Sequence, residues 1–387
     1  MAVGAVPTLL DSPTCIDLAR AALQDEHAQI EGWQVHELHA SLGPGARLHR
    51  YRGAAETNRI EASWSFVVKS FSSEGEGFRA AGSSADAWDY WKREWHVYRA
   101  PWLPRLQGGL VAPRCLGTGE GEGGAWIAME DLTDYDERPW SLQNFATTAR
   151  HLGEFNGSYL VGEPIPSESW LPQNWLRGWT ARAEPMIRLL PEVADHPLIG
   201  RIYPPTAVQE MLQLWSEREV LHDALERLPQ TFCHQDSFPS NVFLRRSAQL
   251  EQSVAIDWAF CGQGPVGQDL APLVAASLHL FQAEGLDPGR LEAQCLQAYL
   301  AGLRAAGWSG PEDDVRLGYL GSVVLRYSLG LVGPVLMCLL DEAMHAFLEE
   351  AFGHPLDDIV EHYRAAVRLN ERWAAQLRQL LASRGAR

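Results

Sequence analysis

The chain has 387 residues, of which 46% are hydrophobic and 21% are charged, a composition typical of a folded protein that is too long for one compact core. Its net charge of −17 disfavours nucleic acids and anionic membrane surfaces as partners, because both repel an acidic protein. The six cysteines are scattered without metal-site spacing, as is typical of free thiols in a reducing compartment, so we expect a cytoplasmic protein whose oligomeric state the sequence leaves open.

The first part of the chain predicts a helix followed by a sheet. Residues 1–32 are predicted to form an N-terminal helical extension. From 33 to 70 the pattern favours strands, and residues 64–69 form the clearest one because they are rich in aromatic and β-branched types. A loop rich in Ser and Gly is expected over 70–77.

The next segment predicts one helix and two more strands. Ser83 and Ser84 are candidate caps for this helix, along which aromatic residues recur at three- and four-residue steps: Trp88, Trp91, Trp95 and Tyr98. Strands are expected over 111–116 and 125–129. A small lobe, residues 33–133, is therefore expected to be an antiparallel sheet with one helix.

Residues 134–387 are predicted to form a larger, mainly helical lobe. Apolar residues follow helical spacing from Leu142 to Tyr159. A pair of short strands is expected at 242–244 and 254–256. The longest apolar run, Leu329 to Leu340, contains Gly and Pro; it is too short to span a bilayer and predicts a buried helix. The fold class is therefore α+β.

The most informative segment is His234 to Asn241, which has the pattern HxDxxxxN and is followed by the strand pair and Asp257. A β-hairpin returns the chain to its starting point, so Asn241 and Asp257 should meet at one end of it. Asp236, on the same loop as Asn241, can face them. The alternative interpretation is a capped turn whose Asp and Asn residues are purely structural.

These three side chains suit phosphoryl transfer. The Asn241 amide oxygen and the Asp257 carboxylate can hold Mg²⁺ against nucleotide phosphates. Asp236 can orient an acceptor hydroxyl and receive its proton.

Residues 233–241 resemble the HGDxxxxN loop of the aminoglycoside phosphotransferase family, and residues 256–270 resemble its second signature, which ends here in Asp269-Leu270-Ala271. The resemblance in the order of elements covers roughly residues 33–300. It implies a protein-kinase-like fold of two lobes. It also implies a small-molecule kinase that uses ATP (or GTP) and Mg²⁺ and phosphorylates a small hydroxylated metabolite or antibiotic.

The resemblance implies further site residues in the small lobe. Lys69 stands where the family has a strand lysine that holds the nucleotide phosphates, and Val67, on the same strand face, would line the nucleotide pocket. Glu94 stands where a helix glutamate pairs with this lysine. The alternative interpretations are a strand-end surface lysine for Lys69 and a boundary glutamate exposed to water for Glu94.

The connection between the lobes resembles the hinge of the family. Met129, Glu130 and Leu132 would lie beside the nucleotide base, which binds to backbone groups there. Asp269 is expected to support the catalytic loop through backbone hydrogen bonds. His234 is expected to be a buried support of the same loop rather than a base.

Some positions depart from the family pattern. Gln235 replaces the usual glycine of HGD, and Asn156 lies in a Phe-Asn-Gly segment where the family often has Leu-His. The phosphate-covering loop has no strong glycine pattern, so residues 43–45 and Gly53 are only candidates, and simple turns explain them equally well.

Two other functions remain open. A protein kinase is disfavoured because the segment between Asp257 and Asp269 is short and leaves little platform for a peptide. A non-catalytic nucleotide-binding protein would be expected to have lost some of the residues named above.

The acceptor is not identified by the sequence. Tryptophans could form a wall of its site, or pack in the core: Trp170, Trp175 and Trp179. Acidic residues of the large lobe could bind a polycation, or simply be solvated: Asp341, Glu342, Asp357 and Asp358.

Overall fold

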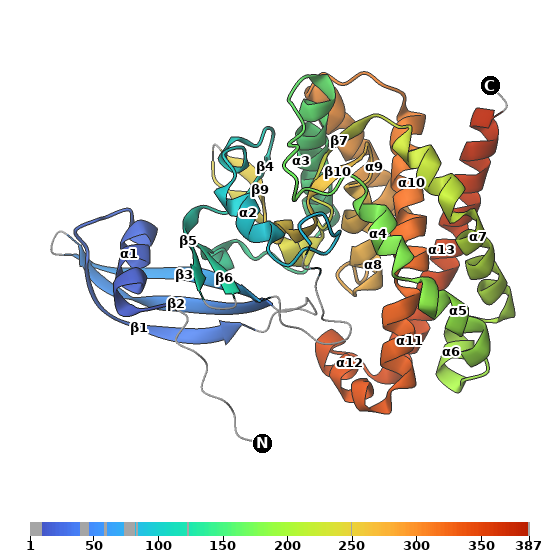
Figure 1. Ribbon diagram of the computed structural model, residues 1–387, viewed down its shortest axis with the longest axis horizontal. Helices are drawn as coiled ribbons and strands as arrows, with labels where there is room; N and C mark the ends of the chain where they lie inside the picture. The colour runs from blue at the N-terminus through green and yellow to red at the C-terminus, as the bar shows by residue number, and fades with distance from the viewer. Residues whose placement is uncertain are drawn as a thin grey trace.

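The structure, a computed structural model, describes residues 10–38, 46–57, 60–72, 82, 84–121, 124–248 and 250–385. It has two lobes (Figure 1), a smaller N-terminal one built on a sheet and a larger C-terminal one built mainly of helices. The predicted α+β class and kinase-like arrangement are therefore confirmed.

The N-terminal lobe is an antiparallel sheet with a helix on one face. Among the described residues the sheet has five strands in the order β1-β2-β3-β6-β5. Their bounds are Gln29–Leu38 (β1), Ala46–Thr57 (β2), Ile60–Ser72 (β3), Cys115–Gly121 (β5) and Gly124–Glu130 (β6). Helix α1 (Ser12–Leu23) packs through Cys15 and Leu18 on buried residues of β3, among them Phe66.

Strand β3 confirms the clearest predicted strand and positions two site residues. It continues to Ser72, so residues 70–72 are not the loop that was expected, and the rest of that predicted loop lies outside the described residues. Side chains alternate between the faces of a strand. Phe66 and Val68 are buried under α1, and Val67 and Lys69 therefore project from the opposite face.

The helix of the N-terminal lobe is shorter than predicted. Helix α2 spans only Arg93–Arg99, and the residues from 84 to 92 form turns. Ser84 therefore does not cap it, and Ser83 is not among the described residues. The reason is that Arg93, which is fully buried, uses the carbonyl groups of Ala87 and Trp88 as hydrogen-bond acceptors, which leaves the preceding chain folded back as a loop.

The predicted strand over 111–116 is divided between the lobes. Strand β4 (Leu110–Val111) pairs in parallel with β9 (Glu251–Ala255) of the C-terminal lobe. Strand β5 begins at Cys115 and pairs with β6. The chain therefore attaches to the larger lobe before it completes the smaller one.

The C-terminal lobe confirms the long helix and the strand pair expected from the sequence, which are α3 (Leu142–Val161) and the hairpin of β8 (Val242–Arg246) with β9. A second pair, β7 (Gln230–Cys233) with β10 (Gly262–Pro265), was not predicted. The other helices are α4 (Trp175–Ala181), α5 (Glu184–Val193), α6 (Pro197–Ile202), α7 (Pro205–Glu226), α8 (Ser277–His279), α9 (Pro288–Ala305), α10 (Glu312–Val323), α11 (Val332–Leu340), α12 (His345–Phe352) and α13 (Leu356–Gly385).

The apolar run near residue 330 belongs to a longer helical stretch than the sequence suggested. Helix α10, the π-helical segment η7 (Val324–Leu329) and α11 follow one another. Within the described residues, this stretch, Glu312–Leu340, alone is long and apolar enough to cross a membrane by length and composition, and 67% of its apolar window is buried inside the protein. As expected, it forms part of the core.

Candidate active site

The HxDxxxxN segment forms a loop between β7 and β8, and Asp269 stabilises this loop through hydrogen bonds to its backbone. The Asp269 carboxylate accepts hydrogen bonds from the backbone N–H of His234 at 2.9 Å and of Gln235 at 2.7 Å. This is the supporting role that was predicted for Asp269. Asn156 of α3 adds a further bond, because its Nδ2 donates to Asp269 at 3.0 Å. The sequence pattern had indicated no role for Asn156.

His234 is buried in the structure and belongs to the support of the loop. Its Nε2 lies 3.0 Å from the carbonyl oxygen of Ile256, and its Nδ1 accepts the backbone N–H of Asp236. Burial lowers the pKa of His234 to about 4. A neutral imidazole that already has partners on both nitrogens suits a structural role, as expected.

The β8–β9 hairpin brings Asn241 and Asp257 to the same end. Val242 pairs with Ala255, and the backbone N–H of Ile256 donates to the carbonyl oxygen of Asn241 at 2.9 Å. Asp257 then adopts a left-handed conformation with φ of 61°. The chain leaves the extended course of β9 at this residue. We infer that the left-handed backbone directs the Asp257 carboxylate toward Lys69 of the smaller lobe.

Lys69 joins the two lobes at the site. Its Nζ lies 2.6 Å from Glu94 Oε2 and 3.0 Å from Asp257 Oδ1. The predicted Lys69–Glu94 ion pair is thus present. Burial alone would lower the pKa of Lys69, but the two carboxylates raise it above its usual value. Burial raises the pKa of Glu94 to about 7 against the charge of Lys69.

Asp257 keeps its charge in this arrangement. Burial works to raise its pKa, but the charge of Lys69 and the hydrogen bond from it outweigh burial, so the pKa lies below the usual value. A charged carboxylate is the form that binds a metal ion.

Asp236 is held between two donors. Asn241 Nδ2 donates to Asp236 Oδ2 at 2.9 Å, and Arg326 Nη2 donates to Asp236 Oδ1 at 2.5 Å. Burial raises the pKa of Asp236 to about 6, although the charge of Arg326 opposes this. Arg326 was not found by sequence reasoning: it lies in η7, far along the chain, and no motif spacing connects it to the loop.

Gln235 shows how a larger residue fits where the family usually has glycine. Its backbone is left-handed, with φ of 74°, a conformation that favours glycine. Its side chain accepts a hydrogen bond from Gln268, and its carbonyl oxygen accepts one from Arg326. We infer that these contacts offset the backbone strain of a left-handed conformation at a residue other than glycine.

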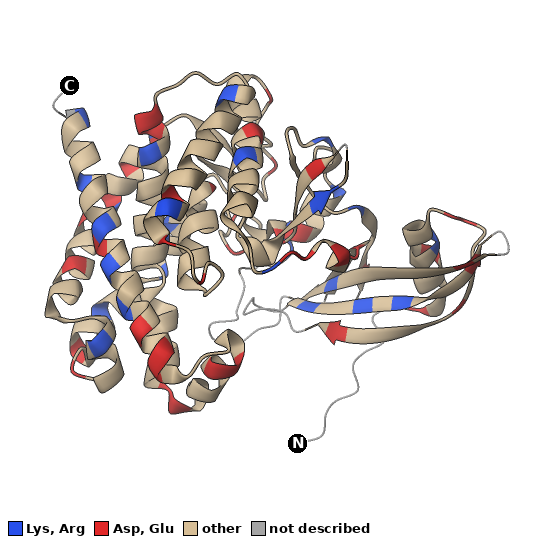
Figure 2. Ribbon diagram, turned by 180° about the vertical axis from the view of Figure 1, so that it is seen from behind, with Lys and Arg blue, Asp and Glu red and all other residues tan. Residues whose placement is uncertain are grey.

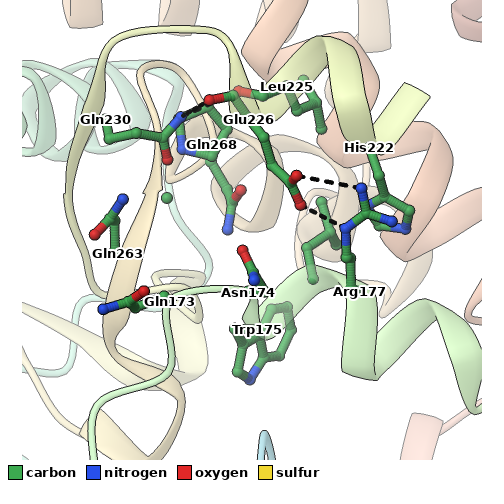
Figure 3. Close-up of a pocket in the computed structure, with 13 residues that line it drawn as sticks. Gln173, Asn174, Trp175, Arg177, His222, Leu225, Glu226, Gln230, Gln263 and Gln268 are labelled. Carbon is green, nitrogen blue, oxygen red and sulfur yellow. Dashed lines mark hydrogen bonds and ion pairs between the residues drawn. The ribbon is translucent and has the colours of Figure 1, made fainter. Parts of the chain in front are cut away.

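A small pocket lies behind the loop and is lined by amide side chains (Figure 3). Gln268, Gln230 and Asn174 come to the pocket from different parts of the chain, and Gln268 also donates to Gln235 of the loop. Nearby, Arg177 pairs with Glu226 at 2.5 Å. The pocket has a volume of about 30 Å³, which is enough for a water molecule or two but not for a nucleotide. It is therefore not the nucleotide site.

The residues expected at the hinge lie at and just after the end of β6. Met129 and Glu130 end β6 and face Val67 and Phe66 of β3 in its register, and buried Leu132 follows them. The Glu130 side chain pairs with Arg245 of β8 at 2.7 Å, which ties the hinge to the larger lobe. Contact of Val67, Met129, Glu130 or Leu132 with a nucleotide stays a prediction.

The phosphate-covering loop is not identified. Residues 43–45 lie outside the described part of the chain. Gly53 lies within β2, opposite Trp64 of β3, so it does not form a loop, and this candidate was wrong. A Cβ atom at Gly53 would meet the carbonyl oxygen of Gly32 at 2.3 Å, so the glycine serves the close approach of β1 to β2.

The oxygen atoms at the hairpin end fit a hard divalent cation. Asn241 uses its amide nitrogen for Asp236, so its amide oxygen is not needed for that bond, and 36% of the Asp257 side chain is exposed. No group of three or more His, Cys, Asp or Glu residues that could hold a metal is found among the described residues. A metal here would therefore depend on these two ligands together with phosphate oxygens and water, as Mg²⁺ commonly does.

The tryptophans suggested as a wall for the acceptor have different surroundings. Trp175 is buried and stacks on half-buried Trp179, with ring centroids 5.5 Å apart. Trp170 stacks instead on His96 and Trp102. Trp175 and Trp179 lie beside Arg326 and hence near Asp236.

Comparisons with known proteins agree with this geometry. The sequence model of the phosphotransferase enzyme family matches residues 99–309. A search of curated proteins found no match.

Solved structures show the same fold at low sequence identity. A choline kinase from Cryptosporidium parvum Iowa II is 12% identical with a TM-score of 0.53, covering 95% of this chain and 97% of its own. An amicoumacin kinase in complex with AMP-PNP, Ca²⁺ and Ami is 14% identical (TM-score 0.52, 91% and 94%). A microcompartment-associated aminopropanol kinase is 16% identical (TM-score 0.51, 93% and 98%).

Proposed function

Because this chain belongs to the phosphotransferase enzyme family, we propose that it transfers the γ-phosphoryl group of ATP (or GTP) to a hydroxyl group of a small metabolite or antibiotic, with Mg²⁺ as cofactor. The observation that carries the proposal is the position of Asp236, which is held by Asn241 on the same loop while Asp257 pairs with Lys69 across the cleft. The names of the similar kinases support a small hydroxylated acceptor.

Each lobe has a task in this mechanism. Lys69 holds the nucleotide phosphates, and Glu94 and Asp257 keep it charged and in place. Val67 and the hinge residues Met129, Glu130 and Leu132 hold the base. Asn241 and Asp257 would hold Mg²⁺, which would neutralise charge on the phosphates.

Asp236 orients the acceptor hydroxyl and receives its proton. Its two oxygen atoms each accept one hydrogen bond within the protein, and each retains a second lone pair for the hydroxyl. Because a loose transition state needs little proton removal, orientation is the larger part of this role.

Neither of the two alternatives is favoured by the part of the chain that the structure describes. A non-catalytic nucleotide-binding protein does not need Asp236 held in one orientation. A protein kinase needs a peptide platform, and the segment from Asp257 to Asp269 contains only η5 (Trp258–Phe260) and β10.

The test is Asp236→Asn. We expect nucleotide affinity, measured by calorimetry with a non-hydrolysable analogue, to stay nearly unchanged, because Lys69, the hinge and the metal ligands are untouched. Turnover should fall by roughly a hundredfold or more, the usual scale for a positioned base.

The acceptor for this assay comes from a mass-spectrometric screen of hydroxylated metabolites and antibiotics. Unchanged turnover would refute the mechanism and favour the non-catalytic alternative. Loss of nucleotide affinity with normal turnover at saturation would assign Asp236 to the nucleotide site instead.

A further inference from the structure

Arg326 reaches the catalytic loop from an unusual helical segment. Residues Val324–Leu329 form the π-helix η7, a rare geometry that often occurs at functional sites. From there the guanidinium donates to Asp236 Oδ1 at 2.5 Å and also to the carbonyl oxygen of Gln235. The Arg326 side chain thus binds both the Asp236 carboxylate and the backbone of the loop.

The same guanidinium is surrounded by aromatic rings. Its central carbon lies 4.7 Å from the ring centroid of Trp175, 5.5 Å from that of Trp179 and 5.1 Å from that of Tyr327. Arg326 is only 6% exposed. Aromatic faces grouped around a point are how proteins bind organic cations. An aromatic cation site therefore exists beside Asp236, and a residue of the chain itself fills it.

We infer that Arg326 sets the charge class of the acceptor: the site takes a compound that is neutral or anionic beside the transferred hydroxyl and discriminates against organic cations. This inference rests on the proposed kinase function. A cationic group next to the hydroxyl would lie near the Arg326 guanidinium, which is already paired with Asp236. It would therefore find neither a free carboxylate nor an open aromatic face.

Other charges near the aromatic rings agree with this assignment. Arg182 lies 5.5 Å from the ring of Trp88, which packs edge-on against Trp179, so a second guanidinium adjoins the same aromatic group, with Asp89 near it. The Nε of Arg326 has no hydrogen-bond partner among the described residues.

Two of the acidic residues suggested for a polycation, Asp341 and Asp357, have partners within the protein. Figure 2 shows acidic residues, coloured red on the ribbon, around α12 and the start of α13. There, Asp357 pairs with Arg201 at 2.7 Å, and Asp341 accepts the backbone N–H of Ala343.

The first test probes the aromatic site with tetramethylammonium, a cation without a hydroxyl, using tryptophan fluorescence. Arg326→Ala should bind it saturably in the millimolar range, whereas the wild-type protein should not. Arg218→Ala is the matched control, because Arg218 lies 4.0 Å from the ring of Trp215 on α7, away from Asp236. Saturable binding to the wild type, or none to a folded Arg326→Ala, would overturn the inference.

The second test compares three small hydroxylated acceptors of different charge: anionic glycerate, neutral glycerol and cationic 2-amino-1,3-propanediol. With the wild type we expect the amine to be the poorest by at least about tenfold in kcat/KM. Arg326→Met, which keeps bulk without charge, should reduce this discrimination to near unity while the affinity for the nucleotide is unchanged. Arg326→Lys should retain it, whereas a merely structural role would lower all three rates alike.

Each outcome decides between the inference and its alternatives. A wild-type preference for the amine, or an unaltered preference in Arg326→Met, contradicts it. If none of the three compounds is phosphorylated, the tetramethylammonium measurement decides alone. Failure of the kinase proposal would appear separately, as unchanged behaviour of Asp236→Asn.

Discussion

At the scale of single residues, the site depends on buried charged side chains that form ion pairs and hydrogen bonds with one another. Lys69 has two carboxylate partners, Glu94 and Asp257, and Asp236 has Asn241 and Arg326. Removing one member from such a set leaves a buried charge without its partner, which costs more than the pair contributes. The members therefore differ in what their loss should do to folding and to catalysis.

Asp257→Ala should abolish phosphoryl transfer while the fold survives. Lys69 keeps Glu94 as its partner at 2.6 Å, so the small lobe retains its ion pair. Loss of a principal metal ligand should cost several kcal/mol of transition-state stabilisation. Turnover at ordinary Mg²⁺ and the melting temperature are the measurements.

Asp223→Ala, which removes an exposed partner of Arg177, is the control for the loss of an aspartate. Near-normal turnover of Asp257→Ala would show that this carboxylate does not hold the metal.

At the scale of secondary-structure elements, Arg93 connects helix α2 to the larger lobe. Its guanidinium donates to the carbonyl oxygens of Trp170 and Ala259, each at 2.8 Å. Ala259 follows Asp257 by two positions, and Glu94 follows Arg93 directly. One buried side chain therefore fixes the helix that carries Glu94 relative to the loop that carries Asp257.

Arg93→Met should both destabilise the protein and weaken the site. Several buried carbonyl groups would lose their donor, at about 1 kcal/mol or more each, so we expect the free energy of unfolding to fall by roughly 3 kcal/mol. The KM for the nucleotide should rise because Glu94 is no longer held against Lys69.

Arg99→Met is the matched control for this measurement. Arg99 lies on the same helix, and its side chain is 54% exposed. Equal losses of stability in denaturant titrations of the two variants would contradict the role given to Arg93.

The sequence predicted the elements that carry a local pattern. Strand β3, helix α3 and the β8–β9 hairpin have clear periodicity, and the HxDxxxxN spacing was sufficient to predict that Asp236, Asn241 and Asp257 lie together. Helix α2 was predicted too long because the aromatic spacing of Trp88 and Trp91 imitates a helix. In the structure Trp88 packs on Trp175 and Trp179 of the other lobe instead.

What the sequence could not predict depends on contacts between distant segments. Arg326 and Asp236 are 90 positions apart, and Asn156 and Asp269 are 113 apart, so no spacing rule connects them. The pairing of β7 with β10 has the same cause, since its strands are short and lack alternation. Arg326 reaches Asp236 from the π-helical segment η7, and no sequence pattern predicted this segment.

At the scale of the whole molecule, the two lobes are joined where β4 pairs with β9. His151 of α3 lies at this junction. Its Nδ1 is 2.9 Å from Ser253 Oγ of β9, and a Cβ atom on Gly109, just before β4, would meet the His151 ring. The connection between the lobes therefore packs directly on an imidazole.

The His151 imidazole is neutral in the folded protein. Burial, reinforced by the charge of Arg150, lowers its pKa to about 4, while Glu154 and Glu251 oppose the shift and Arg246 adds to it. Arg150 Nη2 lies 3.0 Å from Nε2. Since a guanidinium can only donate, Nε2 is the acceptor and Nδ1 carries the proton toward Ser253.

The junction should therefore weaken in acid. The unfolded chain takes up a proton at His151 near pH 6.5, whereas the folded chain does so only near pH 4. The stability that neutral His151 contributes is complete above pH 6.5 and is lost as the pH falls toward 4. His151→Gln removes this dependence, so its deficit in unfolding free energy relative to the wild type should shrink by about 2 kcal/mol between pH 8 and pH 5. Denaturant titrations of both proteins at the two pH values measure the change, and His27→Gln, at an exposed position, is the control. A deficit that is the same at both pH values would mean that His151 does not stay neutral on folding.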